Sequence, residues 1–212
     1  MMKRRQLLLL AGLPPALALV ACGKRNATAT ALKPDARVLA LGDSLTAGYG
    51  ATAEQSWPTI LAQLTGWQID NEGLNGDTSA GALQRVQALL ADRHYDAVLV
   101  GIGGNDMLRG MSLQATKDNV GAIVRAGLAH TPYVALIATP APEPLRASMG
   151  SLSDAGFYEE VARAEKALLI PQVYSAVLSD AALRSDRIHA NAQGYAVIAQ
   201  QLADRLKAAG WR

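Results

Sequence analysis

The stretch Ala97-Val98-Leu99-Val100-Gly101-Ile102-Gly103-Gly104-Asn105-Asp106 shows in ten residues how this chain is organised. Its first four residues are apolar without polar alternation, which is typical of a strand that is covered on both faces. Three glycines and a polar pair follow, and they predict a tight loop. The stretch therefore predicts a buried strand that brings an amide side chain, Asn105, to one edge of a sheet.

The same alternation continues along the chain and predicts an α/β fold. Short β-rich runs predict further strands at 37–41, 67–71, 133–138 and, more weakly, 168–173. Longer amphipathic segments predict helices at 56–64, 79–90, 113–129, 154–168 and 190–209. Strands that alternate with helices indicate a parallel sheet covered on both faces, a three-layer αβα sandwich. We expect the flavodoxin-like strand order 2-1-3-4-5, in which Ser44 and Asn105 flank the point where the strand order reverses.

Residues 1–21 are predicted to form a lipoprotein signal peptide. Three basic residues, Lys3, Arg4 and Arg5, precede an apolar stretch at 7–20. That stretch has 14 residues and two adjacent prolines, whereas a helix that spans a bilayer needs about 20 residues. The alternative is a short membrane anchor that is retained. Arg4 and Arg5 also resemble a twin-arginine export signal.

Cys22, the only cysteine of the chain, follows Leu19-Val20-Ala21 in a pattern that resembles a bacterial lipoprotein processing box. We expect it to be lipidated and to become the mature N-terminus, followed by a flexible tether at 22–35 and one domain at 36–212. The alternative is an incidental cysteine beside an ordinary cleavage site. Lipidation predicts an exported protein anchored at the periplasmic face of a membrane, with the outer membrane favoured in a Gram-negative host.

Charge and composition argue against two kinds of partner. Cleavage after residue 21 removes three cations from a formal charge of +2, which leaves −1 on 191 residues. That charge gives no electrostatic support for binding to nucleic acid. The three histidines show neither a cluster with cysteine nor paired metal-ligand spacing, so we expect no metal and no cofactor. His94 and His130 lie beside predicted helix ends and are predicted to be surface residues.

Four motifs together supply the parts of an acyl-transfer site. Ser44 lies in Gly42-Asp43-Ser44-Leu45, directly after the first strand. Gly76 and Asn105 follow the second and third strands, and Asp186 precedes His189 by three residues on the loop before the last helix. Parallel strands end at one sheet edge, where ligands bind, so these distant motifs can share a site. A hydroxyl nucleophile, a histidine with a carboxylate, and two donors for an oxyanion are what ester hydrolysis needs.

In three stretches the chain resembles the SGNH hydrolases, also called the GDSL esterase/lipase family. The stretches are VLALGDSLTAGYG at 38–50, NEGLNGDTSAG at 71–81 and DRIHANAQGY at 186–195. The resemblance covers roughly residues 37–206 and is strongest to the small bacterial lysophospholipase, thioesterase and arylesterase type. Arg187 and Ala190 depart from the pattern, since many relatives have glycine and proline at these positions.

The resemblance implies a role for each motif. Ser44 is the implied nucleophile, His189 its base, and Asp186 the carboxylate that orients the histidine. The backbone N–H groups of Ser44 and Gly76 and the Asn105 amide form the implied oxyanion hole. Taken alone, each motif also fits a structural role: a helix N-cap, a histidine beside a capping aspartate, a glycine turn and an Asn-Asp turn.

We therefore predict a monomeric serine esterase that acts through an acyl-enzyme on short-to-medium acyl esters, thioesters or lysophospholipids. A carbohydrate or peptidoglycan O-acetyl esterase would use the same machinery, and a non-catalytic ligand-binding lipoprotein is the alternative outside enzymes. Residues 139–153, with several prolines, are a candidate acyl-binding loop or an inert surface loop. Trp57 and Tyr49 are predicted either to line the cleft or to pack in the core, and Asp43 to be a turn residue.

Overall fold

Five parallel strands form the sheet of the computed structural model, which describes residues 31–143, 145–146 and 149–212. They are β1 (Arg37–Gly42), β2 (Gln68–Gly73), β3 (Ala97–Gly101), β4 (Val134–Ile137) and β5 (Leu168–Ile170). Their order is β2-β1-β3-β4-β5, which confirms the predicted flavodoxin-like order. The strand order therefore reverses between β1 and β3, the strands that lead to Ser44 and Asn105.

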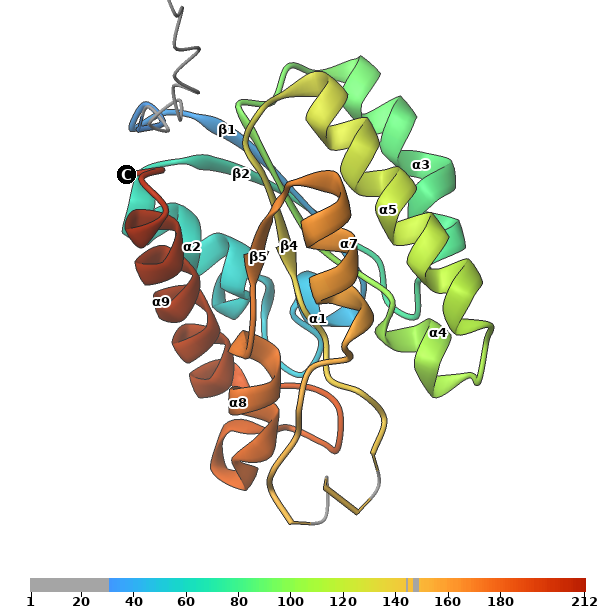
Figure 1. The fold of residues 1–212 in the computed structure, drawn as a ribbon. Helices are drawn as coiled ribbons and strands as arrows, with labels where there is room; N and C mark the ends of the chain where they lie inside the picture. Colours follow the sequence, from blue (N-terminus) through green and yellow to red (C-terminus); the bar gives the residue numbers. More distant parts are fainter. Residues whose placement is uncertain (1–30, 144, 147–148) are drawn as a thin grey trace, which may run out of the picture.

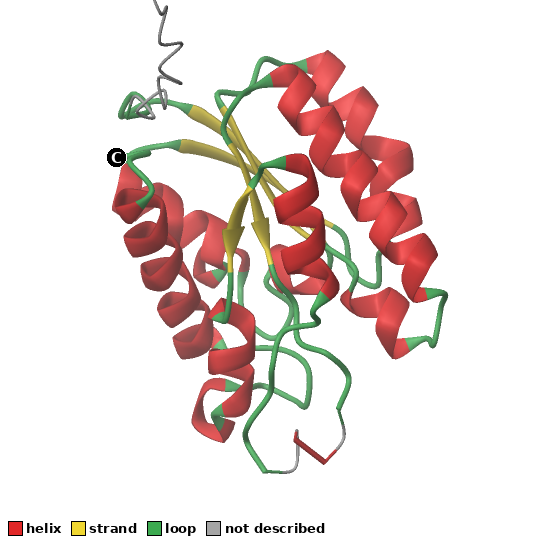
Figure 2. Cartoon of the chain, viewed as in Figure 1, coloured by secondary structure: helices red, strands yellow, loops and turns green. Residues whose placement is uncertain are grey.

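Helices cover both faces of the sheet, and this confirms the predicted three-layer sandwich (Figures 1 and 2). One face is covered by α2 (Trp57–Thr65), α8 (Val173–Ser179) and α9 (Ala192–Ala208). The other face is covered by α3 (Ser79–Asp92), α5 (Leu113–His130) and α7 (Phe157–Glu165). The long helices thus enclose the sheet and leave the carboxyl ends of its strands for loops and short helices.

Burial along the strands explains why the apolar runs lack alternation. In β1, Val38 and Ala40 belong to the core on the α9 side, whereas Leu39 and Leu41 belong to the core on the α5 side. All five residues of β3 are buried for the same reason. The edge strand β2 is polar instead and begins one residue later than predicted.

Several elements end where a local cap or turn intervenes rather than where the pattern predicts. The last helix begins at Ala192 because Asn191 caps it by accepting the N–H of Gly194 at 2.9 Å. The helix predicted at 154–168 is limited to α7. The strand predicted at 168–173 ends at Ile170, because Gln172 has a φ of 64° and turns the chain into α8.

The predicted signal peptide, Cys22 and residues 22–30 of the predicted tether lie outside the described residues. Among the residues that are described, no helix combines the length and the apolar character needed to cross a membrane.

Candidate active site

Ser44 lies where β1 ends and the short helix α1 (Ser44–Ala47) begins. Gly42 pairs with Gly73 of β2 and Gly101 of β3, so three strands finish at the same level. A Cβ on Gly42 would approach Thr46 Oγ1 to 2.1 Å, so the close approach of α1 requires glycine. Ser44 is only 9% exposed, and its backbone N–H has no partner among the described residues.

Asp43 is the N-cap of α1, which agrees with a turn role. Its Oδ1 accepts the N–H of Leu45 at 3.0 Å, and its side chain is buried. Burial raises the pKa of Asp43 to about 7; the bond from Leu45 opposes the rise, and the nearby carboxyls of Asp77 and Asp106 add to it. The carboxyl is therefore partly neutral near pH 7.

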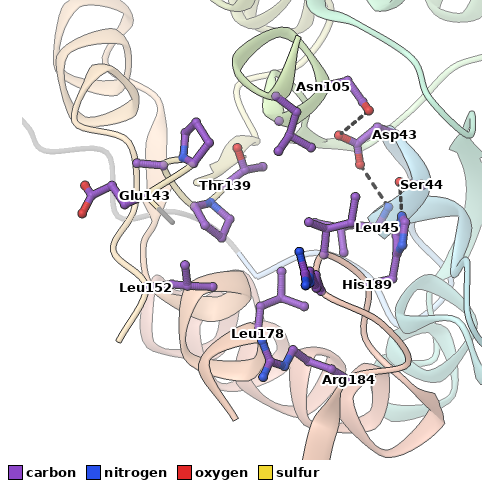
Figure 3. A pocket seen from close by; sticks show the side chains of 17 residues that line it. Asp43, Ser44, Leu45, Asn105, Thr139, Glu143, Leu152, Leu178, Arg184 and His189 are labelled. Atoms are coloured by element: carbon purple, nitrogen blue, oxygen red, sulfur yellow. Dashed lines mark hydrogen bonds between the residues drawn. The ribbon is translucent and has the colours of Figure 1, made fainter. Parts of the chain in front are cut away.

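His189 joins Ser44 to Asp186 in a chain of hydrogen bonds. His189 Nε2 lies 2.9 Å from Ser44 Oγ, and His189 Nδ1 lies 2.7 Å from Asp186 Oδ2 (Figure 3 shows the first contact). Asp186 Oδ1 accepts the backbone N–H groups of Ile188 and His189, both at 2.8 Å. Partial burial acts to raise the pKa of Asp186, but these bonds outweigh it and hold the pKa below its ordinary value. The carboxylate is thus ionised beside the imidazole.

Backbone contacts hold the loop that carries the histidine. The N–H of Ser185 donates to the carbonyl of His189 at 3.0 Å, and Arg184 pairs with Ala190 in an isolated antiparallel bridge. The ring of Tyr49 lies 4.5 Å from the His189 ring, centroid to centroid. Tyr49 therefore packs against the imidazole.

Asn105 lies on the short helix α4 (Gly104–Leu108), and Gly103 with a φ of 111° turns the chain from β3 into it. Its Nδ2 donates to the carbonyl of Asp77 at 2.9 Å and makes a longer contact of 3.5 Å with Asp43 Oδ2. Figure 3 shows Asn105, Asp43 and Ser44 on the same side of the site. One amide N–H is therefore fixed by the backbone, and the other is only weakly engaged.

Gly76 lies in the turn between β2 and α3, directly before Asp77, whose carbonyl accepts the bond from Asn105. Its φ of 75° is in the left-handed region that glycine adopts readily. Its carbonyl accepts a bond from Arg109 Nη2 at 2.8 Å, and its N–H has no partner in the described part of the chain. Gly76 does not line the cavity beside Ser44, so it adjoins the site rather than forming its wall.

Two buried carboxylates that the motifs do not single out organise this side of the site. Asp77 accepts Arg85 Nε at 2.9 Å, and Arg85 Nη2 donates to the carbonyl of Gly42 at 2.9 Å. Asp106 accepts both the N–H and the hydroxyl of Ser79, at 2.8 and 2.5 Å. Asp77 directly follows Gly76, and Asp106 directly follows Asn105. This adjacency was the only feature of the sequence that could have indicated a role for either aspartate in the site.

A cavity of about 680 Å³ opens beside Ser44 and His189. Its walls are formed by Asp43, Ser44, Leu45, Gly104, Asn105, Leu108, Thr139, Pro140, Ala141, Pro142, Glu143, Leu152, Leu178, Arg184, Arg187, Ile188 and His189. Part of the candidate acyl-binding loop, residues 139–143 and Leu152, therefore lies on the wall (Figure 3). Met149 is 71% exposed and does not line the cavity, and Trp57 is fully buried in the core.

The two other histidines differ from one another. The His94 side chain is 78% exposed, as expected of a surface residue. His130 is half-buried, and its Nε2 accepts the backbone N–H of Tyr95 at 2.9 Å, so the surface prediction is wrong for this residue. Among the described residues, no group of three or more His, Cys, Asp and Glu side chains is arranged to hold a metal ion.

Comparison with known proteins gives consistent matches. The chain matches the family model described as GDSL-like Lipase/Acylhydrolase over residues 40–197. Esterase TesA of Pseudomonas aeruginosa is 32% identical over 139 residues, which cover 63% of this chain and 69% of that protein. Thioesterase 1/protease 1/lysophospholipase L1 of Escherichia coli is 34% identical over 178 residues, which cover 80% of this chain and 83% of that protein.

Solved structures agree with these matches. The crystal structure of the psychrotrophic esterase EstA from Pseudoalteromonas sp. is similar with a TM-score of 0.71 and 27% identity, covering 82% of this chain and 98% of that one. The crystal structure of TesA is similar with a TM-score of 0.72 and 27% identity, covering 82% and 99%.

Proposed function

The chain belongs to the GDSL-like lipase/acylhydrolase family and is a serine esterase, and from this premise we propose that Ser44 attacks short-to-medium acyl esters, thioesters and lysophospholipids. The observation that carries the assignment is the contact of 2.9 Å between Ser44 Oγ and His189 Nε2. The relatives named as an esterase and as a thioesterase and lysophospholipase support this range of substrates.

In the proposed reaction, His189 Nε2 takes the proton from Ser44 Oγ as the oxygen attacks the acyl carbon. The carbonyl oxygen becomes an oxyanion, and the tetrahedral intermediate then expels the alcohol or thiol, which receives the proton from His189. Water, deprotonated by the same imidazole, attacks the acyl-Ser44 ester, and the imidazolium returns that proton to Ser44 Oγ as the acid is released. Asp186 keeps the proton of the imidazole on Nδ1 and stabilises the imidazolium that forms between these transfers.

The oxyanion would be bound by the backbone N–H groups of Ser44 and Gly76 and by the Asn105 amide. Two observations support this role. The N–H groups of Ser44 and Gly76 have no partner among the described residues. One N–H of Asn105 is held by the Asp77 carbonyl, which leaves the second weakly bonded and fixed in place. Preorganised donors of this kind stabilise charge without reorganisation during the reaction.

The test is hydrolysis of p-nitrophenyl acyl esters, acyl-coenzyme A and lysophospholipid by the wild type and by Ser44→Ala. The variant should fold normally, lose activity and lose labelling by a fluorophosphonate, a class of reagent related to the monoethylphosphonate that inhibits EstA. Ser151→Ala, at an exposed serine outside the cavity, is the control. Near-wild-type turnover by Ser44→Ala would place the nucleophile elsewhere, and cleavage of acetylated glycans alone would favour an O-acetyl esterase.

For the location of the protein, we propose export and lipid attachment at Cys22 on the periplasmic face of a membrane, at the outer membrane in a Gram-negative host. The basic and apolar leader and the processing-box pattern support this proposal. Metabolic labelling with a palmitate analogue followed by membrane fractionation tests it, with Cys22→Ser as the comparison. An unlabelled, fully soluble wild type would contradict lipidation. Gel filtration of the delipidated protein tests the proposed monomer.

A further inference from the structure

Two arginines line the cavity, and the proposed reaction gives neither of them a role. Arg184 is half-buried and Arg187 is exposed, and both contribute to the wall that also carries His189. In the part of the chain that the structure describes, neither side chain forms an ion pair or a hydrogen bond. Figure 3 shows Arg184 on the opposite side of the cavity from Asn105. Two arginines of the cavity wall therefore lack an ion pair or a side-chain hydrogen bond within the described part of the chain.

Both arginines lie on the loop that carries His189, and backbone contacts hold parts of this loop. Arg184 pairs with Ala190, and the Asn191 amide donates to the Arg184 carbonyl at 3.3 Å. Arg187 lies between Asp186 and Ile188, and the carboxylate of Asp186 accepts the N–H of Ile188 at 2.8 Å. The same short loop thus carries both guanidinium groups and the imidazole that serves Ser44.

The acidic side chains of the cavity do not compensate these cations. Glu143 pairs with Arg146, whose Nε lies 2.6 Å from its Oε2. Asp43 is buried as the cap of α1, and burial raises its pKa to about 7, which reduces its charge near neutral pH. The carboxylate of Asp186, which does not line the cavity, is bonded to His189. The cavity therefore has an uncompensated positive charge at Arg184 and Arg187.

We propose that Arg184 and Arg187 form an anion-binding subsite that selects acyl substrates whose leaving group carries phosphate. This inference rests on the proposed function of Ser44. A guanidinium group binds phosphate through two parallel hydrogen bonds, and it does so without losing its charge. Apolar wall residues such as Leu45, Leu152 and Leu178 offer a surface for the acyl chain. The phosphate can belong to a lysophospholipid headgroup or to a coenzyme A thioester.

The experiment compares three substrates with the same acyl chain: decanoyl-coenzyme A, a decanoyl lysophosphatidylglycerol and the uncharged p-nitrophenyl decanoate. The full-length enzyme is assayed with Arg184→Gln, Arg187→Gln and both changes. For each arginine, the ratio of kcat/KM on a phosphate-bearing substrate to kcat/KM on the uncharged ester should fall about tenfold, mainly through KM. Rising salt should lower this ratio in the wild type, because screening weakens exposed charges, and should leave it unchanged in the double variant.

Arg205→Gln is the matched control, because Arg205 is an exposed arginine on α9 outside the cavity and its loss should not move the ratio. A ratio that the double variant leaves unchanged, with the uncharged ester still cleaved, would overturn the subsite. Equal losses on all three substrates would also overturn it, by assigning the arginines to loop positioning. A fall for only one phosphate-bearing substrate supports the subsite and identifies the source. A wild type that cleaves none of the three would instead refute the proposed function.

Discussion

The site has two parts, the loop that carries His189 and the strand ends that carry Ser44 and Asn105. Their aspartates differ in exposure and in the direction of their pKa shift. In the loop, Asp186 is nearly half exposed and binds groups two and three residues away, and these bonds lower its pKa. At the strand ends, Asp43 is buried, and burial raises its pKa to about 7. The carboxylate of Asp186 is therefore ionised beside His189 with little desolvation, whereas the buried aspartates at the strand ends mainly hold the backbone in place.

The largest effect that this comparison predicts is on turnover, in the loop. Asp186→Asn should lower kcat by about 10⁴, because the amide no longer favours the correct imidazole tautomer or stabilises the imidazolium. The free energy of unfolding should change little, since the asparagine Oδ1 can still accept both backbone N–H groups. Steady-state kinetics and thermal melting measure both quantities. Asp204→Asn, at an exposed residue of α9, is the control, and a kcat within tenfold of the wild type would reject Asp186 as the orienting group.

At the strand ends, a substitution should lower the free energy of unfolding more than it lowers kcat. Asp106 is 1% exposed, and its oxygens accept the N–H and hydroxyl of Ser79 and, more weakly, the hydroxyl of Thr116. Asp106→Ala leaves the buried N–H and hydroxyl of Ser79 without their acceptor, whereas the Thr116 hydroxyl keeps its bond to the Ser112 carbonyl. The change should lower the free energy of unfolding by about 3 kcal/mol. Urea unfolding measures the loss. An unchanged midpoint, or a kcat loss as large as that of Asp186→Asn, would remove the distinction between the two regions.

Asn105 lies between these extremes, because it belongs to the strand ends and also faces the cavity. Asn105→Ala should lower kcat by about 10²–10³ with a smaller change in KM, as expected for loss of one oxyanion donor. It also deprives the Asp77 carbonyl of a bond of 2.9 Å, so a modest loss of stability should accompany it. An increase in KM at constant kcat would show that the amide binds the ground state rather than the oxyanion.

The residues that were predictable from the sequence are those whose contacts are local or follow from strand order. Asp186 and His189 are three residues apart, and their bond of 2.7 Å needs only one loop. Ser44 and Asn105 follow strands that pair in the sheet, and the register of Gly42 with Gly101 brings them to one edge.

Contacts that depend on tertiary packing were not predictable in this way. The bond between Asp106 and Ser79 depends on how α4 docks against the start of α3, and no pattern in the sequence records that docking. His130 is half-buried, and its Nε2 accepts the N–H of Tyr95, a residue 35 positions away, so its position at a helix end did not predict this contact. Arg187 is visible in the sequence as a departure from the family pattern, but its place on the cavity wall follows only from the structure.

The smallest predicted effect is on the pH dependence of stability, which should differ between Asp43 and Asp186. The pKa of Asp43 is about 7 in the folded protein and 3.8 ordinarily, so between these values the folded state holds a proton that the unfolded state has released. Stability from this group is therefore full below pH 3.8 and falls as pH rises toward 7, by about 2 kcal/mol between pH 5 and pH 7. For Asp186, whose pKa is lowered, the sign is opposite, and stability is lost only as pH falls below its ordinary range.

Asp43→Asn should remove the Asp43 contribution, because the amide does not titrate and its Oδ1 can still accept the N–H of Leu45. Urea unfolding at pH 5, 6 and 7 should give a variant whose stability, relative to the wild type, improves steadily with pH. Asp35→Asn, at an exposed residue before β1, controls for the loss of one carboxylate. A difference between Asp43→Asn and wild type that stays constant over this range would mean that Asp43 is ionised throughout. Both regions would then hold charged carboxylates, and burial at the strand ends would be compensated by bonds as it is in the loop.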